Sequence, residues 1–177
     1  MLQIILIIIA IIILVVLLVA AFMKKDSSIV SEIEINKPQR VVFDFVKILR
    51  NQEKYSKWVM ADPNSKIEYI GTDGTVGFIS SWKSEMKNVG VGEQEIINIV
   101  DGERYDVEIR FEKPFKGISK AIITTEFVDA NKTKVTTTFN SHTAFPMNLM
   151  SAMMKNMLQK DMDINSKALK KVLEESK

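Results

Sequence analysis

The stretch RYDVEIRF, residues 104–111, alternates strictly between charged and apolar side chains. Its even-numbered residues carry a charge, and its odd-numbered residues are aliphatic or aromatic. Successive side chains of a β-strand point to opposite faces of the sheet, so this pattern predicts a strand with one buried and one solvated face. A sheet with one solvated face is typically antiparallel.

The sequence on both sides of this strand indicates further strands joined by short turns. All seven glycines fall between Gly71 and Gly117, and glycine marks turns and bulges. The pair Asp101-Gly102, just before residue 104, is typical of a tight hairpin turn. We therefore expect an antiparallel meander, with its other strands at residues 29–35, 67–70, 76–82, 90–100, 119–128 and 134–142.

Helices are expected before and after the glycine-rich part of the chain. Asn36 is placed to cap a first helix whose apolar stripe ends at Leu49. A second, short helix is expected from Gln52 to Trp58. Residues 147–174 predict one long amphipathic helix. The fold class is therefore α+β, with a curved antiparallel sheet around a long C-terminal helix.

The long helix is rich in methionine, since six of the ten methionines lie between Met147 and Met162. A curved sheet wrapped around a helix can leave an apolar cavity between them. Methionine is an adaptable lining for such a cavity, because its side chain is flexible and its sulfur polarizable. The same stripe is also typical of ordinary core packing, so both interpretations stay open.

Residues 1–23 contain no charged side chain, and Gln3 is the one residue among them that is not apolar. As a helix this segment spans roughly 33 Å, enough to cross the hydrocarbon core of a bilayer. A cleaved signal peptide is the alternative, with Val19-Ala20-Ala21 as its cleavage site. Signal peptides have a basic start and a shorter apolar run, whereas the first basic residue here is Lys24.

We therefore predict a transmembrane anchor at residues 1–23, a linker at 24–28 and one soluble domain at 29–177. All 24 basic and 22 acidic residues lie after the anchor. Lys24 and Lys25 favour a cytoplasmic location of the domain by the positive-inside rule, in a single-pass membrane protein.

Several parts of the domain resemble the polyketide cyclase/dehydrase-type branch of the START/Bet v 1-like (SRPBCC) superfamily. The more specific ones are EKPF at residues 112–115 and FPMNLM at residues 145–150. The others are residues 33–45, Trp58 with Asp62-Pro63, Trp82, and Gly90 with Gly92. The resemblance implies the helix-grip fold and a cavity for a hydrophobic ligand, and it implies no single reaction.

One part of the chain departs from this family pattern. Similar sequences often carry an Asp-Leu pair at the end of the first helix, followed by tryptophans. Here the helix ends in Ile48-Leu49, and Gln52 and Tyr55 occupy expected aromatic positions, while Trp58 is retained.

The candidate ligand-binding residues are aromatic side chains expected on the concave face and methionines of the long helix. They are Trp58, Trp82, Tyr105, Phe111, Phe127, Phe139, Phe145, Met150, Met154 and Met157.

The sequence excludes or disfavours several kinds of site. Cysteine is absent, which excludes disulfides, zinc–cysteine sites and a cysteine nucleophile. His142 is the single histidine, and no acidic cluster has the spacing of a metal site, so no metal or cofactor is predicted. The net charge of +2 with interspersed signs argues against nucleic-acid binding.

Catalysis would need an ionisable side chain inside the cavity. Arg110, Glu126 and His142 are the candidates, and the strand alternation places all three on the outer face. The predicted function is therefore membrane-anchored binding, transport or sequestration of a hydrophobic small molecule or lipid. The alternatives are a cyclase- or dehydratase-like enzyme that uses the same cavity, and a protein-interaction module without a ligand.

Overall fold

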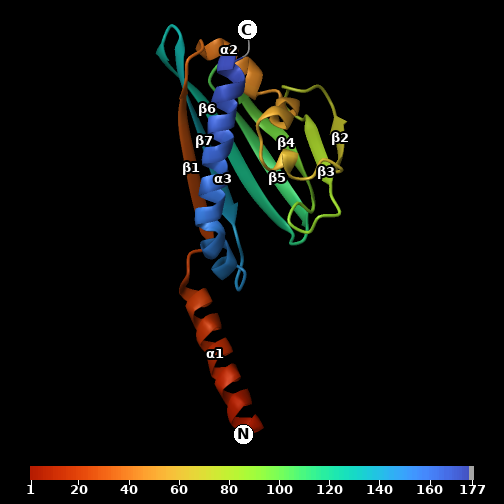
Figure 1. The fold of residues 1–177 in the computed structure, drawn as a ribbon, viewed down its shortest axis with the longest axis vertical. Helices are drawn as coiled ribbons and strands as arrows, with labels where there is room; N and C mark the ends of the chain where they lie inside the picture. The colour runs from red at the N-terminus through yellow and green to blue at the C-terminus, as the bar shows by residue number, and fades with distance from the viewer. Residues whose placement is uncertain (176–177) are drawn as a thin grey trace.

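The computed structural model describes residues 1–175 and contains one seven-stranded antiparallel sheet with strand order β1-β7-β6-β5-β4-β3-β2. Figure 1 shows the sheet curving around the long helix α3, with α1 projecting from one end. The helices are α1 (Leu2–Phe22), α2 (Gln39–Val46) and α3 (Asn148–Glu175), with 3₁₀ segments η1 (Leu49–Lys54) and η2 (Val59–Ala61). The strands are β1 (Asp26–Ile35), β2 (Lys66–Ile70), β3 (Ile79–Lys83), β4 (Val91–Val100), β5 (Arg104–Lys113), β6 (Gly117–Asp129) and β7 (Lys132–His142).

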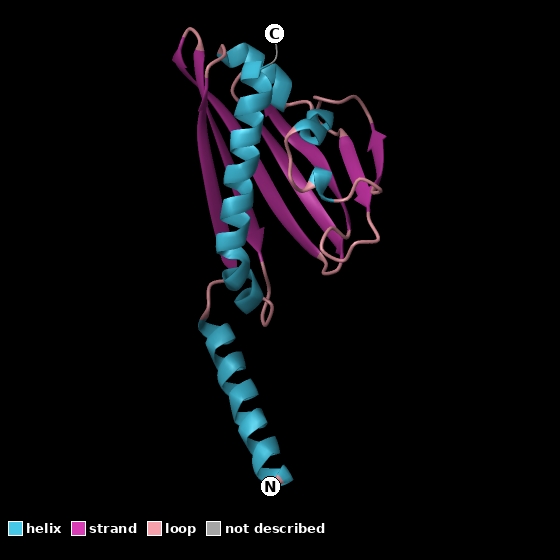
Figure 2. Ribbon diagram, in the orientation of Figure 1, coloured by secondary structure: helices cyan, strands magenta, loops and turns pink. Residues whose placement is uncertain are grey.

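Sequential strands pair with one another, except that β1 pairs with β7. The connection from β1 to β2 contains α2, η1 and η2, and it crosses from one edge of the sheet to the other (Figure 2). The helix α3 packs along β1, where Gln159 Nε2 donates a 2.8 Å hydrogen bond to Val30 O and Ser31 Oγ donates one of 2.8 Å to Asp163 Oδ1. The predicted α+β architecture, a curved sheet around a C-terminal helix, is confirmed.

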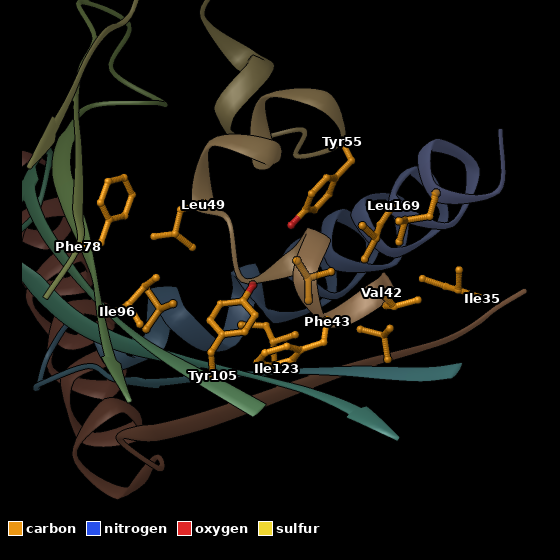
Figure 3. Close-up of a cluster of buried hydrophobic side chains, with 14 residues drawn as sticks. Ile35, Val42, Phe43, Leu49, Tyr55, Phe78, Ile96, Tyr105, Ile123 and Leu169 are labelled. Carbon is orange, nitrogen blue, oxygen red and sulfur yellow. The ribbon is translucent and has the colours of Figure 1, made fainter. Parts of the chain in front are cut away.

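The alternation in β5 sets the two faces of the sheet as predicted. Tyr105 and Val107 are 1% and 2% exposed on the concave side. The charged residues between them lie on the outer face, where Arg110 forms ion pairs with Glu93, Glu95 and Glu108. Figure 3 shows the concave side chains meeting those of α2 and α3 in one core. Burial of this apolar surface is the main force that holds α2 and α3 on the sheet.

Four predicted element boundaries were wrong. The first helix, α2, has Pro38 at its N-cap and ends at Val46, so Asn36 does not cap it and Leu49 lies in η1. The strand β1 begins at Asp26 instead of Ile29, because the presumed linker residues 26–28 pair with β7, with Asp26 opposite His142. The expected helix from Gln52 to Trp58 is instead η1 and η2, two short 3₁₀ segments. The strand β3 begins at Ile79 instead of residue 76, because Gly77 has a φ of +87°, outside the β region.

The helix α1 is 21 residues long, with a mean hydropathy of 3.8 over an 18-residue window, and it is long and apolar enough to span a membrane. A signal sequence would have the same features. Its last turn joins the domain through Asn148, whose Nδ2 donates to Ala20 O at 2.6 Å and to Met23 O at 3.2 Å. These bonds supplement the capping at the end of the helix, where Ala20 O also accepts a 3.3 Å bond from Met23 N. Thr143 N also donates to Lys25 O at 2.8 Å.

Candidate ligand-binding site

A partly open cavity of about 120 Å³ lies between α3, the η1–η2 region and the concave face of the sheet. Its walls are mostly apolar, with a few amide and hydroxyl groups, as is usual for small-molecule sites. The apolar and aromatic lining residues are Val46, Tyr55, Trp58, Tyr105, Val107, Ile109, Ala121, Ile123, Phe139, Met162 and Leu169. The polar ones are Gln52, Ser56, Gln94, Thr137, Asn165 and Ser166.

Two tyrosine hydroxyl groups are the central polar feature of this cavity. Tyr55 comes from the end of η1 and Tyr105 from β5, and Figure 3 shows their hydroxyls pointing toward each other. Neither hydroxyl makes a hydrogen bond within residues 1–175, and neither is completely enclosed by protein, so each faces the cavity space and can donate to or accept from a ligand. Nearby, Gln94 Nε2 donates a 2.9 Å hydrogen bond to Gln52 Oε1.

Burial keeps both tyrosines protonated. It raises the pKa of Tyr55 well above its usual value. It also raises the pKa of Tyr105, with a further contribution from the neighbouring Tyr55. Both groups therefore act as neutral hydroxyls at physiological pH. The lining otherwise contains no Asp, Glu, Lys, Arg or His within the described part of the chain.

We expect these shifts to make the protein sensitive to alkali. A tyrosine with a raised pKa in the folded state contributes stability that is complete below the unfolded-state pKa of about 10. Above that pH the free energy of unfolding should fall by up to about 1.4 kcal/mol per pH unit for each such tyrosine. Denaturant titrations between pH about 8 and 11 should show a smaller fall in the double variant Tyr55→Phe/Tyr105→Phe than in the wild type. Equal falls in the two proteins would contradict this assignment.

The entrance of the cavity is set by a contact between α3 and the segment before η2. Asp161 accepts a 2.5 Å bond from Lys57 Nζ on Oδ1 and a 3.3 Å bond from Trp58 Nε1 on Oδ2. Trp58 is 41% exposed, so its indole lies between the cavity and solvent. Asp161, which is 9% exposed, thus holds the aromatic side chain at the entrance.

A row of methionines continues from this entrance along α3. Met157, Met154 and Met150 precede Asp161 by 4, 7 and 11 residues, which places them on the same helix face as Asp161. They are 50%, 39% and 36% exposed. The buried stripe of α3 is a different one, formed by Met162, Ser166, Leu169 and Leu173. We call Met150, Met154 and Met157 the methionine row.

Of the ten predicted site residues, the structure brings Trp58, Tyr105 and Phe139 together in the cavity lining. The methionine row lies outside the enclosed space, on the face of α3 that leads to it. Phe145 is 45% exposed in the loop before α3, and Phe127 is 67% exposed on β6, near the turn to β7. Phe127 has the parity of the concave face, but β6 extends beyond the core at this end, so its side chain has nothing to pack against.

Trp82 and Phe111 pack against each other edge to face, with ring centroids 6.0 Å apart. Trp82 does not line the cavity beneath α3. It lines a larger hollow of about 350 Å³ on β2–β5, together with Lys66, Glu68, Lys83, Glu93 and Glu112. The charged side chains of that hollow make it a poor site for an apolar ligand, so the smaller cavity is the better candidate.

Sequence reasoning missed most of the polar lining. Gln52 and Tyr55 depart from the family pattern, and both line the cavity. This departure is the sequence signal that could have identified them as lining residues. Ser56, Asn165 and Ser166 carry no comparable signal. Ser56 lies in the connection between η1 and η2, Asn165 lies beside the buried stripe of α3 and Ser166 within it, and no sequence pattern distinguishes these lining residues from other polar residues.

The three ionisable candidates for catalysis lie outside the cavity. Arg110 lies on the outer face, where its hydrogen bonds to Glu95, the larger contribution, and to Glu93 raise its pKa. Glu126 is exposed. His142 is paired with Asp26 through a 2.7 Å contact at Nδ1 and is 62% exposed. Among residues 1–175 no group of three or more acidic or histidine side chains is placed to hold a metal ion.

The fold is similar to solved structures of Bet v 1-like proteins. Norcoclaurine synthase from Thalictrum flavum, solved with dopamine and hydroxybenzaldehyde, gives a TM-score of 0.66 at 14% identity, over 86% of this chain and 88% of its own. Ara h 8.0201 gives a TM-score of 0.60 at 18% identity, over 84% of this chain and 97% of its own. A protein from Mesorhizobium loti gives a TM-score of 0.59 at 12% identity, over 85% of this chain and 99% of its own. No protein-family model and no curated protein matches the sequence.

The chain therefore has the helix-grip fold of the START/Bet v 1-like superfamily, as the sequence resemblance to its polyketide cyclase/dehydrase-type branch implied. Identities of 12–18% establish the fold and leave the ligand and the activity to be argued from the cavity itself.

Proposed function

We propose that this protein binds an amphiphilic small molecule or lipid, with the polar end of the ligand inside the cavity beneath α3. The observation that carries this proposal is the pairing of an apolar, partly open cavity with two tyrosine hydroxyls that face it and make no hydrogen bond within residues 1–175. The neighbouring structures support it only through the fold that they share with this chain.

The size of the cavity limits what can enter. Its volume of about 120 Å³ is below the 300–1,000 Å³ typical of drug-sized ligands, whereas a cavity of about 150 Å³ is known to hold benzene. The enclosed space therefore suits one ring or one short end of a ligand. The remainder extends past Trp58 and along the methionine row, where flexible side chains adapt to an apolar tail.

The tyrosines define the chemistry of the enclosed end. A hydrogen bond contributes about 0.5–1.5 kcal/mol, so an oxygen placed between Tyr55 and Tyr105 would be stabilised by both. A carbonyl or hydroxyl group on the ligand meets this need. We therefore infer a ligand with an oxygenated head and an apolar tail, of the lipid or isoprenoid-like class.

The helix α1 supports a location at a membrane, where such a ligand partitions. We propose that it is retained as a single-pass anchor, and that Lys24 and Lys25 keep the domain on the cytoplasmic side. The absence of carboxylate, histidine, lysine and arginine from the described lining favours binding over turnover. No observation favours the cyclase- or dehydratase-like alternative.

Native mass spectrometry of the full chain tests this proposal. Delipidated protein incubated with a membrane lipid extract should retain an oxygenated apolar compound. The Tyr55→Phe/Tyr105→Phe variant should bind that compound about tenfold more weakly, since each lost hydrogen bond contributes about 0.5–1.5 kcal/mol. Tyr69→Phe is the matched control, because Tyr69 lies on β2 and outside the cavity lining. Delipidated protein that retains no compound would refute the proposal.

A further inference from the structure

The end of the domain that carries α1 has three exposed apolar side chains, each on a different loop. Met86 is 43% exposed in residues 84–90, Phe115 is 60% exposed in residues 114–116, and Phe145 is 45% exposed in residues 143–147. We call these segments the anchor-side loops. Figure 1 shows them together at the end of the sheet nearest α1, with the hairpins after β4 and β6 at the opposite end.

The strand register and the loop contacts agree with this placement. Phe111 pairs with Gly117, Ser119 with Ser141, and Asp26 with His142, so the turn after β5, the end of β7 and the start of β1 lie on one side of the molecule. The loops 84–90 and 114–116 approach each other closely, since a Cβ on Gly90 would lie 2.0 Å from the carbonyl oxygen of Lys113.

The position of α1 indicates which way these loops face relative to a bilayer. The two bonds from Asn148 and the one from Thr143 fix the end of α1 to the base of α3 and to the loop that carries Phe145. If α1 spans the bilayer, the domain is held against the surface of that bilayer with the anchor-side loops toward the lipid. Phenylalanine is among the side chains that interfacial segments insert at the boundary between lipid headgroups and acyl chains.

The charges at this end fit an acidic lipid surface. Lys24, Lys25, Lys87, Lys113 and Lys116 are exposed and form no ion pair within the described part of the chain. The exposed acidic side chains beside them are Glu85 and Glu112, while Asp26 is paired with His142. A lysine near an anionic membrane surface is attracted to it, so the excess of lysine favours acidic lipids.

We propose that the anchor-side loops dock on the anionic surface of the same bilayer that α1 spans, inserting Phe115, Phe145 and Met86 at the headgroup level. This proposal rests on the proposed membrane-spanning role of α1 and is independent of the nature of the ligand. Docking brings the base of α3, where the methionine row begins, next to the lipid. A ligand then passes between bilayer and cavity along this row, whose apolar side chains reduce the surface that the ligand exposes to water.

The absence of cysteine makes the test direct, because a single introduced cysteine can be labelled with an environment-sensitive fluorophore. The full chain is reconstituted into vesicles of phosphatidylcholine and phosphatidylserine that contain a nitroxide-labelled lipid as quencher. The labelled variants are Phe115→Cys and Phe145→Cys at the anchor-side loops and Ile9→Cys inside α1. Phe127→Cys is the matched control, since Phe127 is as exposed as Phe115 but lies at the opposite end.

We expect lipid quenching to be several-fold stronger at positions 115 and 145 than at position 127, and weaker at both in vesicles of phosphatidylcholine alone. One outcome is that the label at position 9 is quenched while the labels at 115 and 145 are quenched no more than the label at 127. This outcome would overturn the docking and leave the membrane span intact. Unquenched label at position 9 would refute the span itself and the docking with it. Labels at 115 and 145 that are shielded from aqueous iodide but not quenched by lipid would show that protein, such as a second copy of this chain, covers the loops, which also overturns the proposal.

Discussion

Replacing Ala121 by phenylalanine should reduce ligand retention by about tenfold or more, a loss of at least about 1.4 kcal/mol in binding free energy. Ala121 lines the cavity from β6, between Val107 on β5 and Phe139 on β7. A phenyl ring on its Cβ takes up most of a space of about 120 Å³, because a cavity of about 150 Å³ holds one benzene molecule. Native mass spectrometry of the variant after incubation with membrane lipid extract measures the loss.

The matched control is Ile122→Phe. Ile122 is the next residue of β6 and points to the opposite face of the sheet, so the same large side chain is added outside the cavity. This variant should retain the ligand as the wild type does. Equal retention by Ala121→Phe and Ile122→Phe would show that the ligand does not occupy the space beneath α3.

The cavity-filled variant should also remain folded, which separates it from a core-disrupting change. Inserting extra atoms into a filled core typically costs about 1–3 kcal/mol, whereas here the added ring enters existing space. We therefore expect the thermal midpoint of Ala121→Phe to stay close to that of the wild type. A lower midpoint together with lost binding would mean that the ring does not fit.

The sheet could be predicted from sequence because its signal is periodic. In β5 each even residue is charged and each odd one is apolar, so the concave positions of Tyr105 and Val107 follow from the period of a strand alone. Asp101-Gly102 marks the hairpin because Gly102 takes a φ of +80°, which side chains disfavour. These features depend on residues that are neighbours in the sequence.

The candidate site depends instead on residues that are distant in sequence, and there the prediction was partial. Tyr55 lies in an aperiodic 3₁₀ region, so no pattern directs its side chain toward Tyr105. The methionine row was correctly placed on a helix, but an apolar stripe is usually assumed to face the core. The contacts of Asp161 with Lys57 and Trp58 place its side of α3, which carries the methionine row, toward the entrance, while the buried stripe lies on another side of the helix.

Replacing Phe43 by alanine should have the largest effect on stability, about 3–5 kcal/mol. Phe43 is 0% exposed in α2 and belongs to the core that joins α2 to the concave face. Removing its ring both loses the transfer free energy of the buried atoms and leaves a void that the surrounding side chains close only partially. Since domains of this size are stable by about 5–15 kcal/mol in total, the variant should unfold at a much lower denaturant concentration.

The contrast with Val41→Ala on the same helix makes this measurement specific. Val41 is 48% exposed, so its truncation removes few buried contacts and should change the free energy of unfolding by about 0.5 kcal/mol or less. Phe43 also supports the part of α2 that ends in Val46, a lining residue of the cavity. Phe43→Ala should therefore weaken ligand retention as well as stability, whereas Ala121→Phe weakens retention alone. Similar unfolding midpoints for Phe43→Ala and Val41→Ala would contradict the packing of α2 on the sheet, and with it the wall of the cavity that α2 provides.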